Sequence, residues 1–311
     1  LKYSCCCYDL GTHGLDQAED RALELTCKRA DLHDGQEILE LGCGWGSLSL
    51  WMAKHFPKSC IRSVSNSHSQ REYIMGTAKE RGLNNLEVVT ADVNAFKPDQ
   101  SYDRVVSVEM FEHVRNHRQL FQQIFNWLNP GGKLFTHVFC HRSTSYPFEV
   151  EGEDDWMSKH FFSGGTMPAD ELFLRICGGL ELERRWRWSG RHYGETSEDW
   201  LRNLDQNKSR PPALTIRLSP ETKSKKTILW GFPTILPLNS MLNEGFFAIQ
   251  YDASSFQAIL KSDLVETDVQ SESQSFKQPC NHLFKFSGNP PAGSIELTPL
   301  TGVSNLRFTS A

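Results

Sequence analysis

The sequence has no Cys-x-x-Cys pair, no zinc-ligand spacing of cysteines and histidines, and no apolar run of membrane-spanning length. Its nine cysteines are odd in number and follow no pattern along 311 residues, which argues against a disulfide framework and favours reduced thiols in the cytosol. The apolar stretch 228–249 is interrupted by Pro233 and Pro237, and no signal peptide is present. We therefore expect a cytoplasmic protein without a bound metal or an integral membrane segment.

Positive charge is also scarce. The 33 Lys and Arg are outnumbered by 38 Asp and Glu, and the net charge of −5 gives no reason to expect nucleic acid or an anionic membrane surface as a partner. No internal repeat is present. Hydrophobic residues make up 39% of the chain, enough for a globular core, while a mean hydropathy of −0.46 indicates that part of the chain is polar. The chain begins at Leu1 instead of Met, so we expect a fragment whose N-terminal part is missing.

One stretch combines a buried strand, a glycine turn and a helix. The apolar run 38–41 predicts the strand, three glycines follow at alternate positions, and the amphipathic segment 47–56 predicts the helix. Glycine lets a ligand approach the backbone, and the next helix N-terminus offers N–H groups to an anion. The third glycine of dinucleotide binders is replaced by Ser47, whereas Glu40 completes the Glu-x-Gly-x-Gly-x-Gly pattern typical of S-adenosylmethionine binding. A tight turn in any α/β protein is the alternative.

Strands and helices are expected to alternate along the first part of the chain. The expected strands are 38–41, 61–64, 86–90, 104–108 and 134–139, and the expected helices are 15–30, 47–56, a segment that ends near Gly82, and 119–128, which a turn at 129–132 terminates. This order predicts a doubly wound α/β fold with a parallel sheet covered on both faces. Ligands bind beyond the carboxyl ends of such strands, where we expect Gly42, Ser65, Asp92, Glu109 and His137.

The character of the sequence changes after about Asp205. Proline, serine and lysine become frequent and the periodicity fades, although the apolar segment 245–249 could pack locally. We therefore predict one domain over 1–208 and an atypical, irregular and partly disordered region over 209–311.

Several blocks of the sequence carry a resemblance to a known family. They include Leu1-Lys-Tyr-Ser-Cys5, Glu40-Leu-Gly-Cys-Gly-Trp-Gly46, Ser107-Val-Glu-Met-Phe-Glu-His113 and Phe161-Phe-Ser-Gly-Gly-Thr-Met-Pro168. Over roughly residues 1–208, the chain resembles the coclaurine N-methyltransferase-like branch of the cyclopropane-fatty-acyl-phospholipid synthase superfamily. The family's N-terminal helical region and its C-terminal helical region have no counterpart in this sequence.

The resemblance implies a Rossmann-like methyltransferase fold and S-adenosylmethionine as cofactor. The residues expected to contact it are Tyr3 and Ser4 at the methionyl part, Gly42 and Gly44 at the loop, Asn66 and Gln70 at the ribose, and Asp92 and Val93 at the adenine. Without the resemblance, Asn66 and Gln70 are better interpreted as a helix N-cap and a solvated first-turn residue. Asp92 is then equally well interpreted as a turn acid.

Glu109, Glu112 and His113 form the predicted catalytic centre. Methylation of an amine needs its lone pair, but an alkylammonium with a pKa of about 10.4 is mostly protonated at neutral pH. A carboxylate would attract the cation, and a base with a pKa near 7 would take its proton. His113 has a suitable ordinary pKa of about 6.5, and Glu112 would orient it or accept the proton itself. The three share a face if the strand turns helical after Glu109. An exposed turn, or catalysis by positioning alone, are the alternatives.

Glu109 also bears on the substrate. Lipid-modifying members of the family have glycine at this position and bind bicarbonate, with contacts that correspond to Cys5, Glu112, His137, Phe139 and Tyr193. An added carboxylate suits a cationic amine and disfavours an anion. We therefore interpret Cys5, Cys6 and Cys7 as small buried residues and not as the remnant of a bicarbonate site.

The expected substrate contacts are His137, Phe139 and Tyr193. An aromatic box around a cation would draw on Phe111, Phe139, Phe148, Trp156, Phe161, Phe162 and Tyr193. The predicted function is N-methylation of a small, isoquinoline-like amine. Cyclopropane-synthase-type methyl or methylene transfer to a lipid is one alternative, and a truncated, non-catalytic paralogue is another. The oligomeric state stays open.

Overall fold

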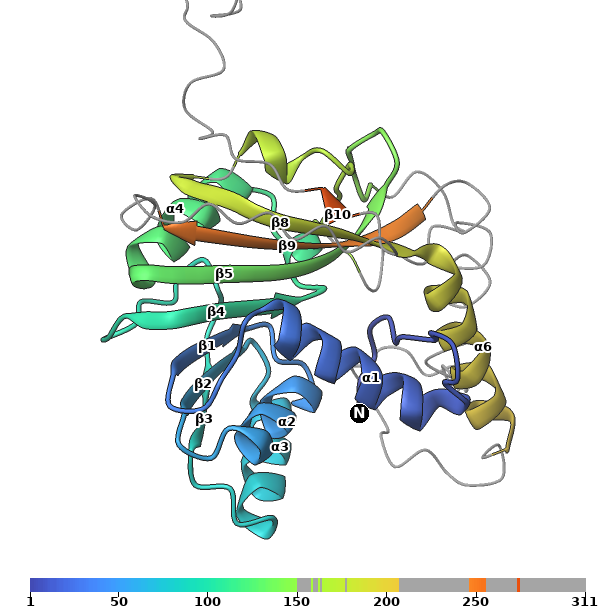
Figure 1. Ribbon diagram of the computed structural model, residues 1–311, viewed down its shortest axis with the longest axis horizontal. Helices are drawn as coiled ribbons and strands as arrows, with labels where there is room; N and C mark the ends of the chain where they lie inside the picture. Colours follow the sequence, from blue (N-terminus) through green and yellow to red (C-terminus); the bar gives the residue numbers. More distant parts are fainter. Residues whose placement is uncertain are drawn as a thin grey trace, which may run out of the picture.

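The computed structural model describes residues 1–149, 158, 162, 164–176, 178–206, 246–255 and 273–274. Eight strands form the central sheet in the order β10-β8-β9-β5-β4-β1-β2-β3 (Figure 1). They are β1 Glu37–Leu41, β2 Cys60–Ser65, β3 Leu86–Thr90, β4 Tyr102–Val108, β5 Leu128–His141, β8 Leu180–Ser189, β9 Phe246–Ser255 and β10 Ser273–Gln274. The strands from β3 to β5 are parallel, whereas β9 runs antiparallel to both of its neighbours.

The helices alternate with the strands. They are α1 Gly14–Arg29, α2 Ser47–His55, α3 His68–Glu80, α4 His117–Trp127 and α6 Gly190–Gln206, with short 3₁₀ helices η1 Phe111–His113 and η2 Phe173–Arg175. A separate two-stranded sheet pairs β6 Tyr146–Pro147 with β7 Thr166–Met167. This alternation confirms the predicted doubly wound α/β fold.

Two apolar cores lie on the two faces of the sheet. Leu39 and Leu41 of β1 pack with α4, whereas Ile38 of the same strand packs with α1, α2 and α3. Figure 1 shows α4 on one side of the strands and α1, α2 and α3 on the other. Because successive side chains of a strand point to opposite faces, a strand covered on both sides is apolar at nearly every position. This explains Ile38, Leu39 and Leu41, whereas the buried Glu40 between them is the polar exception.

The start of β5 differs from the prediction. Tyr102 pairs with Leu128 and Arg104 pairs with Lys133, so residues 129–132 bulge out of a strand that already begins at Leu128. Gly131 has a φ of 79°, which favours glycine. The predicted turn at 129–132 is therefore an interruption inside β5 and not a connection before a strand that begins at 134.

The sheet extends beyond the predicted boundary at residue 208. β9 pairs with β5 from Lys133 to His141 and with β8 from Leu180 to Ser189. The apolar segment 245–249 overlaps this strand, which lies between two strands that are distant from it in sequence. Apart from β9 and β10, the region 209–311 lies outside the described residues, and its predicted irregular character stays a prediction. Among the described helices, none combines the length and the apolarity that a membrane span requires.

Candidate active site

The glycine loop joins β1 to α2 in left-handed backbone conformations. Gly42, Gly44 and Gly46 have φ values of 81°, 52° and 81°. The N–H groups of Gly42 and Cys43 donate to the Val64 carbonyl at 3.0 and 3.1 Å, which ties the loop to the end of β2. A Cβ atom on Gly44 would lie 2.6 Å from Cε1 of Tyr3, so the Tyr3 ring covers this glycine directly. The loop therefore needs glycine both for its conformation and for the close approach of Tyr3.

Glu40 lies buried beneath this loop. Its Oε2 atom accepts a short hydrogen bond from Ser49 of α2 and one of 2.8 Å from Ser63 of β2. Burial raises the pKa of Glu40 to about 7, although both hydroxyls favour its charged form. The acidic residue of the glycine pattern thus joins the helix that follows the loop to the neighbouring strand.

The N-terminal segment lies against the glycine loop and against α6. Tyr3 lies near Gln70, which partly opposes the rise in the Tyr3 pKa that burial causes. The buried Lys2 ammonium donates to Ser4 Oγ at 2.5 Å and to the Cys5 carbonyl at 2.6 Å. Ser4, predicted to contact the cofactor, therefore has Lys2 as a partner in this structure. The sequence did not single out Lys2 because a lysine is almost always exposed unless it is paired.

The residues predicted at the ribose lie where β2 leads into α3. Ser65 Oγ donates to Gln70 Oε1 at 2.6 Å, and Ser67 is the N-cap of α3, accepting from the Gln70 N–H at 3.4 Å. The interpretation of Asn66 as this N-cap is wrong, and Asn66 is exposed. Gln70 lies beside Tyr3, on the loop side of the α3 N-terminus.

Asp92 and Val93 follow the end of β3. Asp92 Oδ1 accepts from the backbone and side-chain nitrogens of Asn94 at 2.8 and 2.9 Å, as in an Asx turn. Asp92 is exposed, while Val93 packs against the apolar core on the α4 face. The turn interpretation of Asp92 fits this geometry, and its contact with adenine stays a prediction.

Glu109 follows β4 and is the centre of a polar cluster. Its backbone has a φ of 50°, a conformation that is uncommon for any residue other than glycine. The side chain is 7% exposed, and it accepts from the Cys5 N–H at 2.9 Å and from the Tyr193 hydroxyl at 2.8 Å. Burial raises the pKa of Glu109, and the Lys2 charge and these two donors partly oppose that rise. Strained backbone of this kind is common at functional sites.

Glu112 lies one turn further on, in η1. It is fully buried, and its Oε1 atom accepts from the Phe139 N–H of β5 at 2.8 Å. Its Oε2 atom is buried and has no hydrogen-bond partner within the described part of the chain. Burial, reinforced by the charge of Glu109, raises the pKa of Glu112 well above the ordinary range.

His113 confirms the expected helical turn, since η1 spans Phe111–His113. His113 is exposed, and its ring stacks on Phe162, with centroids 4.9 Å apart. Reduced hydration lowers the pKa of His113, so its ring is neutral near pH 7. A neutral imidazole at the surface is able to accept a proton.

The predicted substrate residues come from β5 and α6. His137 is buried, its Nε2 atom lies 3.6 Å from Glu109 Oε1, and burial together with the charges of Lys2 and Arg29 lowers its pKa well below the ordinary value. Tyr193 reaches Glu109 from α6, and the pKa of its hydroxyl is raised well above the ordinary value by burial and by the Glu109 charge. Phe139 lies edge-on to Tyr193. His137 and Tyr193 therefore meet at Glu109, and Phe139 adjoins Glu112.

Further contacts hold the N-terminal segment on α6, and no feature of the sequence predicts them. The Cys6 N–H donates to Thr196 Oγ1, the Tyr8 N–H to His192 Nδ1 and the Tyr8 hydroxyl to Asp199. Cys5, Cys6 and Cys7 are buried thiols, in agreement with their interpretation as small buried residues. Of the predicted aromatic box, Trp156 and Phe161 lie outside the described residues.

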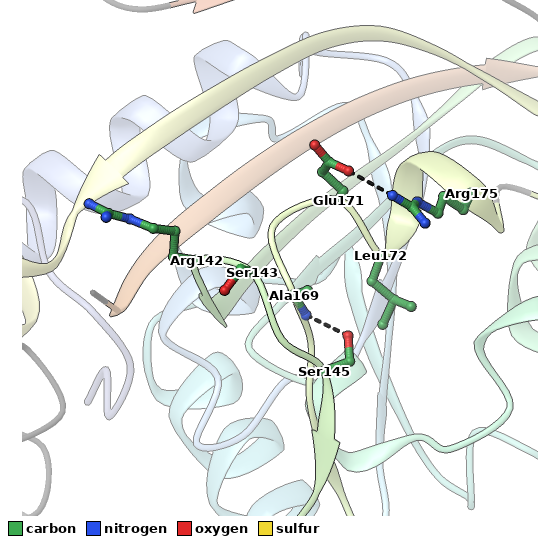
Figure 2. Close-up of a pocket in the computed structure, with 7 residues that line it drawn as sticks. All are labelled: Arg142, Ser143, Ser145, Ala169, Glu171, Leu172 and Arg175. Atoms are coloured by element: carbon green, nitrogen blue, oxygen red, sulfur yellow. Dashed lines mark hydrogen bonds and ion pairs between the residues drawn. The ribbon is translucent and has the colours of Figure 1, made fainter. Parts of the chain in front are cut away.

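Two surface hollows lie away from this cluster. One has a volume of about 320 Å³. The residues that line it, drawn in Figure 2, are Arg142, Ser143, Ser145, Ala169, Glu171, Leu172 and Arg175. In it the Ala169 N–H donates to Ser145 Oγ, and Arg175 pairs with Glu171. The other hollow, of about 450 Å³, lies beside α1 and Trp51. None of the predicted site residues lines either hollow.

Comparisons with known proteins agree with this arrangement. The family model described as mycolic acid cyclopropane synthetase matches residues 1–218. An (S)-coclaurine N-methyltransferase of Thalictrum flavum subsp. glaucum is 40% identical over 209 residues, which are 67% of this chain and 58% of that protein. N-methyltransferase 4 of Papaver somniferum is 31% identical over 252 residues, covering 77% of this chain and 71% of the other.

A solved structure is similar as well. Coclaurine N-methyltransferase bound to N-methylheliamine and SAH superimposes with a TM-score of 0.71 and 31% identity, covering 82% of this chain and 77% of that one. The chain spans less than two thirds of the length of the Thalictrum enzyme. The comparison therefore says nothing about the parts of that enzyme that lie outside the match.

Proposed function

The chain belongs to the mycolic acid cyclopropane synthetase family, and from this premise we propose that it transfers a methyl group from S-adenosylmethionine to the nitrogen of a small amine. The similar proteins named as N-methyltransferases support this choice within the family. The observation that carries it is the pair of buried carboxyl groups, Glu109 and Glu112, at the turn that follows β4. An acidic, water-poor environment of this kind suits a cation with an apolar body.

The residues on the loop side suit the cofactor. Gly42 and Gly44 hold the loop in left-handed conformations, and the first N–H groups of α2 have no partner within their own helix. Tyr3 and Gln70 lie beside the loop, and Asp92 offers a carboxylate at the end of β3. When bound, S-adenosylmethionine supplies a methyl group on a positively charged sulfur. The donors and acceptors at this edge of the sheet would hold it.

On the amine side, the residues have separate tasks. Glu109 attracts the ammonium. The Cys5 N–H and the Tyr193 hydroxyl donate hydrogen bonds to the Glu109 carboxylate and hold it in place. Glu112 and His113 handle the proton that must leave before the nitrogen lone pair is available. Phe139 and Phe162 adjoin these groups, and they would contact the apolar part of the amine.

A binding experiment followed by an assay tests the proposal. Calorimetry with S-adenosylmethionine should give a saturable heat, and the complex should then methylate 1,2,3,4-tetrahydroisoquinoline but not vesicles of unsaturated phospholipid. Tyr193→Phe is the matched variant, because it removes only the hydroxyl group that donates a hydrogen bond to Glu109. This variant should bind the amine more weakly than the parent. Lipid modification with no amine product would favour the cyclopropane-synthase alternative. No saturable heat would contradict the proposed cofactor.

We also propose a cytosolic location, which the sequence predicts from its unpatterned cysteines. The free thiols of Cys5, Cys6 and Cys7, three adjacent cysteines without a disulfide, support it. A fluorescent fusion of the chain in plant cells, compared with cytosolic and organelle markers, would test the location.

A further inference from the structure

The two oxygens of Glu112 have different surroundings. Oε1 accepts the Phe139 N–H at 2.8 Å, whereas Oε2 is buried and meets no hydrogen-bond donor in the parts of the chain that the structure describes. A buried carboxylate oxygen without a donor is unfavourable, because water stabilises the charged form and nothing there replaces the water. A neutral carboxylic acid avoids this loss of hydration.

The groups that face Glu112 also disfavour a second negative charge. The charge of Glu109, directly after β4, acts on Glu112, and the charge of Glu112 acts on Cys140 of β5 and Tyr193 of α6. None of these three supplies a positive charge. Burial and the charge of Glu109 together raise the pKa of Glu112. This shift favours the neutral acid, as does the absence of a donor at Oε2.

The lysine of the N-terminal segment belongs to the same cluster. Lys2 acts on Glu109 and on His137, and its ammonium is held by Ser4 and by the Cys5 carbonyl. With His137 neutral and Glu112 protonated, the charges of Lys2 and Glu109 cancel, and Arg29, which also acts on His137, adds a positive charge. An alkylammonium would then enter a cluster without net negative charge. The cluster would favour the cation far more if it first gained a negative charge.

We propose that Glu112 carries a proton in the amine-free protein and releases it to solvent when an alkylammonium binds. This proposal rests on the proposed function. The Glu112 O–H bond breaks, the proton passes to water, and the carboxylate that remains pairs with the incoming cation. For an ammonium with an N–H bond, that carboxylate then accepts the N–H proton, which returns Glu112 to the acid and leaves the lone pair on nitrogen. Glu112 is therefore able to act as the base only after the amine has bound.

Infrared spectroscopy of the ligand-free full chain tests the protonated state. At pH 8, the difference between the parent and Glu112→Gln should contain the carbonyl band of a carboxylic acid. Glu40→Gln is the control, since Glu40, with a pKa of about 7, should contribute this band at pH 6 and lose most of it by pH 8. A parent-minus-Glu112→Gln spectrum with carboxylate bands alone would overturn the proposal.

Calorimetry of the parent protein tests the exchange without any variant. The probe is N,N-dimethyl-1,2,3,4-tetrahydroisoquinolinium, which has no N–H proton, titrated in buffers of different ionisation enthalpy. Release of about one proton for each cation bound must then come from the protein, and we expect that result. Binding with no proton release would overturn the exchange. Failure of both this probe and tetrahydroisoquinoline to bind would overturn the exchange together with the proposed function, while the infrared band would still decide the protonation of Glu112.

Discussion

Replacing Glu40 by glutamine should change how the stability of the protein depends on pH. The carboxyl group is buried, and its pKa rises from the ordinary 4.5 to about 7 in the folded state. Between these values the folded protein keeps a proton that the unfolded chain has released. The stability associated with this group is therefore complete below about pH 4.5 and is lost as the pH rises toward 7.

The size of this loss follows from the two pKa values. A pKa difference of 1 corresponds to about 1.4 kcal/mol, so the full loss is about 3 kcal/mol, of which about 2.5 kcal/mol falls between pH 5 and pH 8. Glutamine cannot ionise, and its carbonyl oxygen can still accept from Ser49 and Ser63. The unfolding free energy of Glu40→Gln minus that of the parent should therefore grow by about 2.5 kcal/mol from pH 5 to pH 8.

Urea unfolding of both proteins at the two pH values measures this difference. Ser63→Ala provides a second check, because it removes a donor that favours the carboxylate and should make the loss of stability with pH larger than in the parent. A difference between parent and Glu40→Gln that is the same at pH 5 and pH 8 would refute the reasoning, since it would mean that Glu40 is ionised throughout.

Three further substitutions test the proposed site. Gly44→Val should abolish S-adenosylmethionine binding in calorimetry and leave the circular dichroism spectrum unchanged, because Gly44 has a φ of 52° and the valine side chain would collide with the Tyr3 ring. Parent-like affinity would contradict the proposed loop site. Glu109→Gln should raise KM for the amine more than it lowers kcat, since its charge acts on the ammonium in the ground state and the transition state alike; a fall in kcat alone in initial-rate measurements would count against this role. His113→Ala should lower kcat about 10²–10⁴-fold near pH 7, with a smaller loss at higher pH, where solvent already supplies neutral amine. An unchanged pH–rate profile for that variant would leave positioning as the source of catalysis.

Local sequence features were sufficient to predict much of the fold. The apolar run at β1, the glycines after it and the amphipathic segment of α2 lie within twenty residues of one another, so each supports the interpretation of the next. A helical turn after Glu109 was expected only because it would bring Glu109, Glu112 and His113 onto one face, and the 3₁₀ helix η1 follows Glu109 as expected.

Features that depend on pairing between distant segments of the chain could not be predicted from the sequence. β9 occupies its place because β5 and β8 both offer it an edge, and neither strand is near it in the sequence. The burial of Lys2 depends on Ser4 and Cys5 folding back around its ammonium, beside a carboxylate more than one hundred residues away. The same holds for the contact between Tyr8 and Asp199. A single sequence has no signal for such pairs.

The most direct test of the proposed function is a single incubation of the full chain with S-adenosylmethionine carrying an isotopically labelled methyl group. Tetrahydroisoquinoline and unsaturated phospholipid vesicles are supplied together, and the products are identified by mass spectrometry. We expect the label on the amine nitrogen, with formation of this product reduced in Glu109→Gln and the lipid unlabelled. Label in the lipid chains, or an amine product whose rate is the same with Glu109→Gln, would contradict N-methylation at the Glu109 cluster.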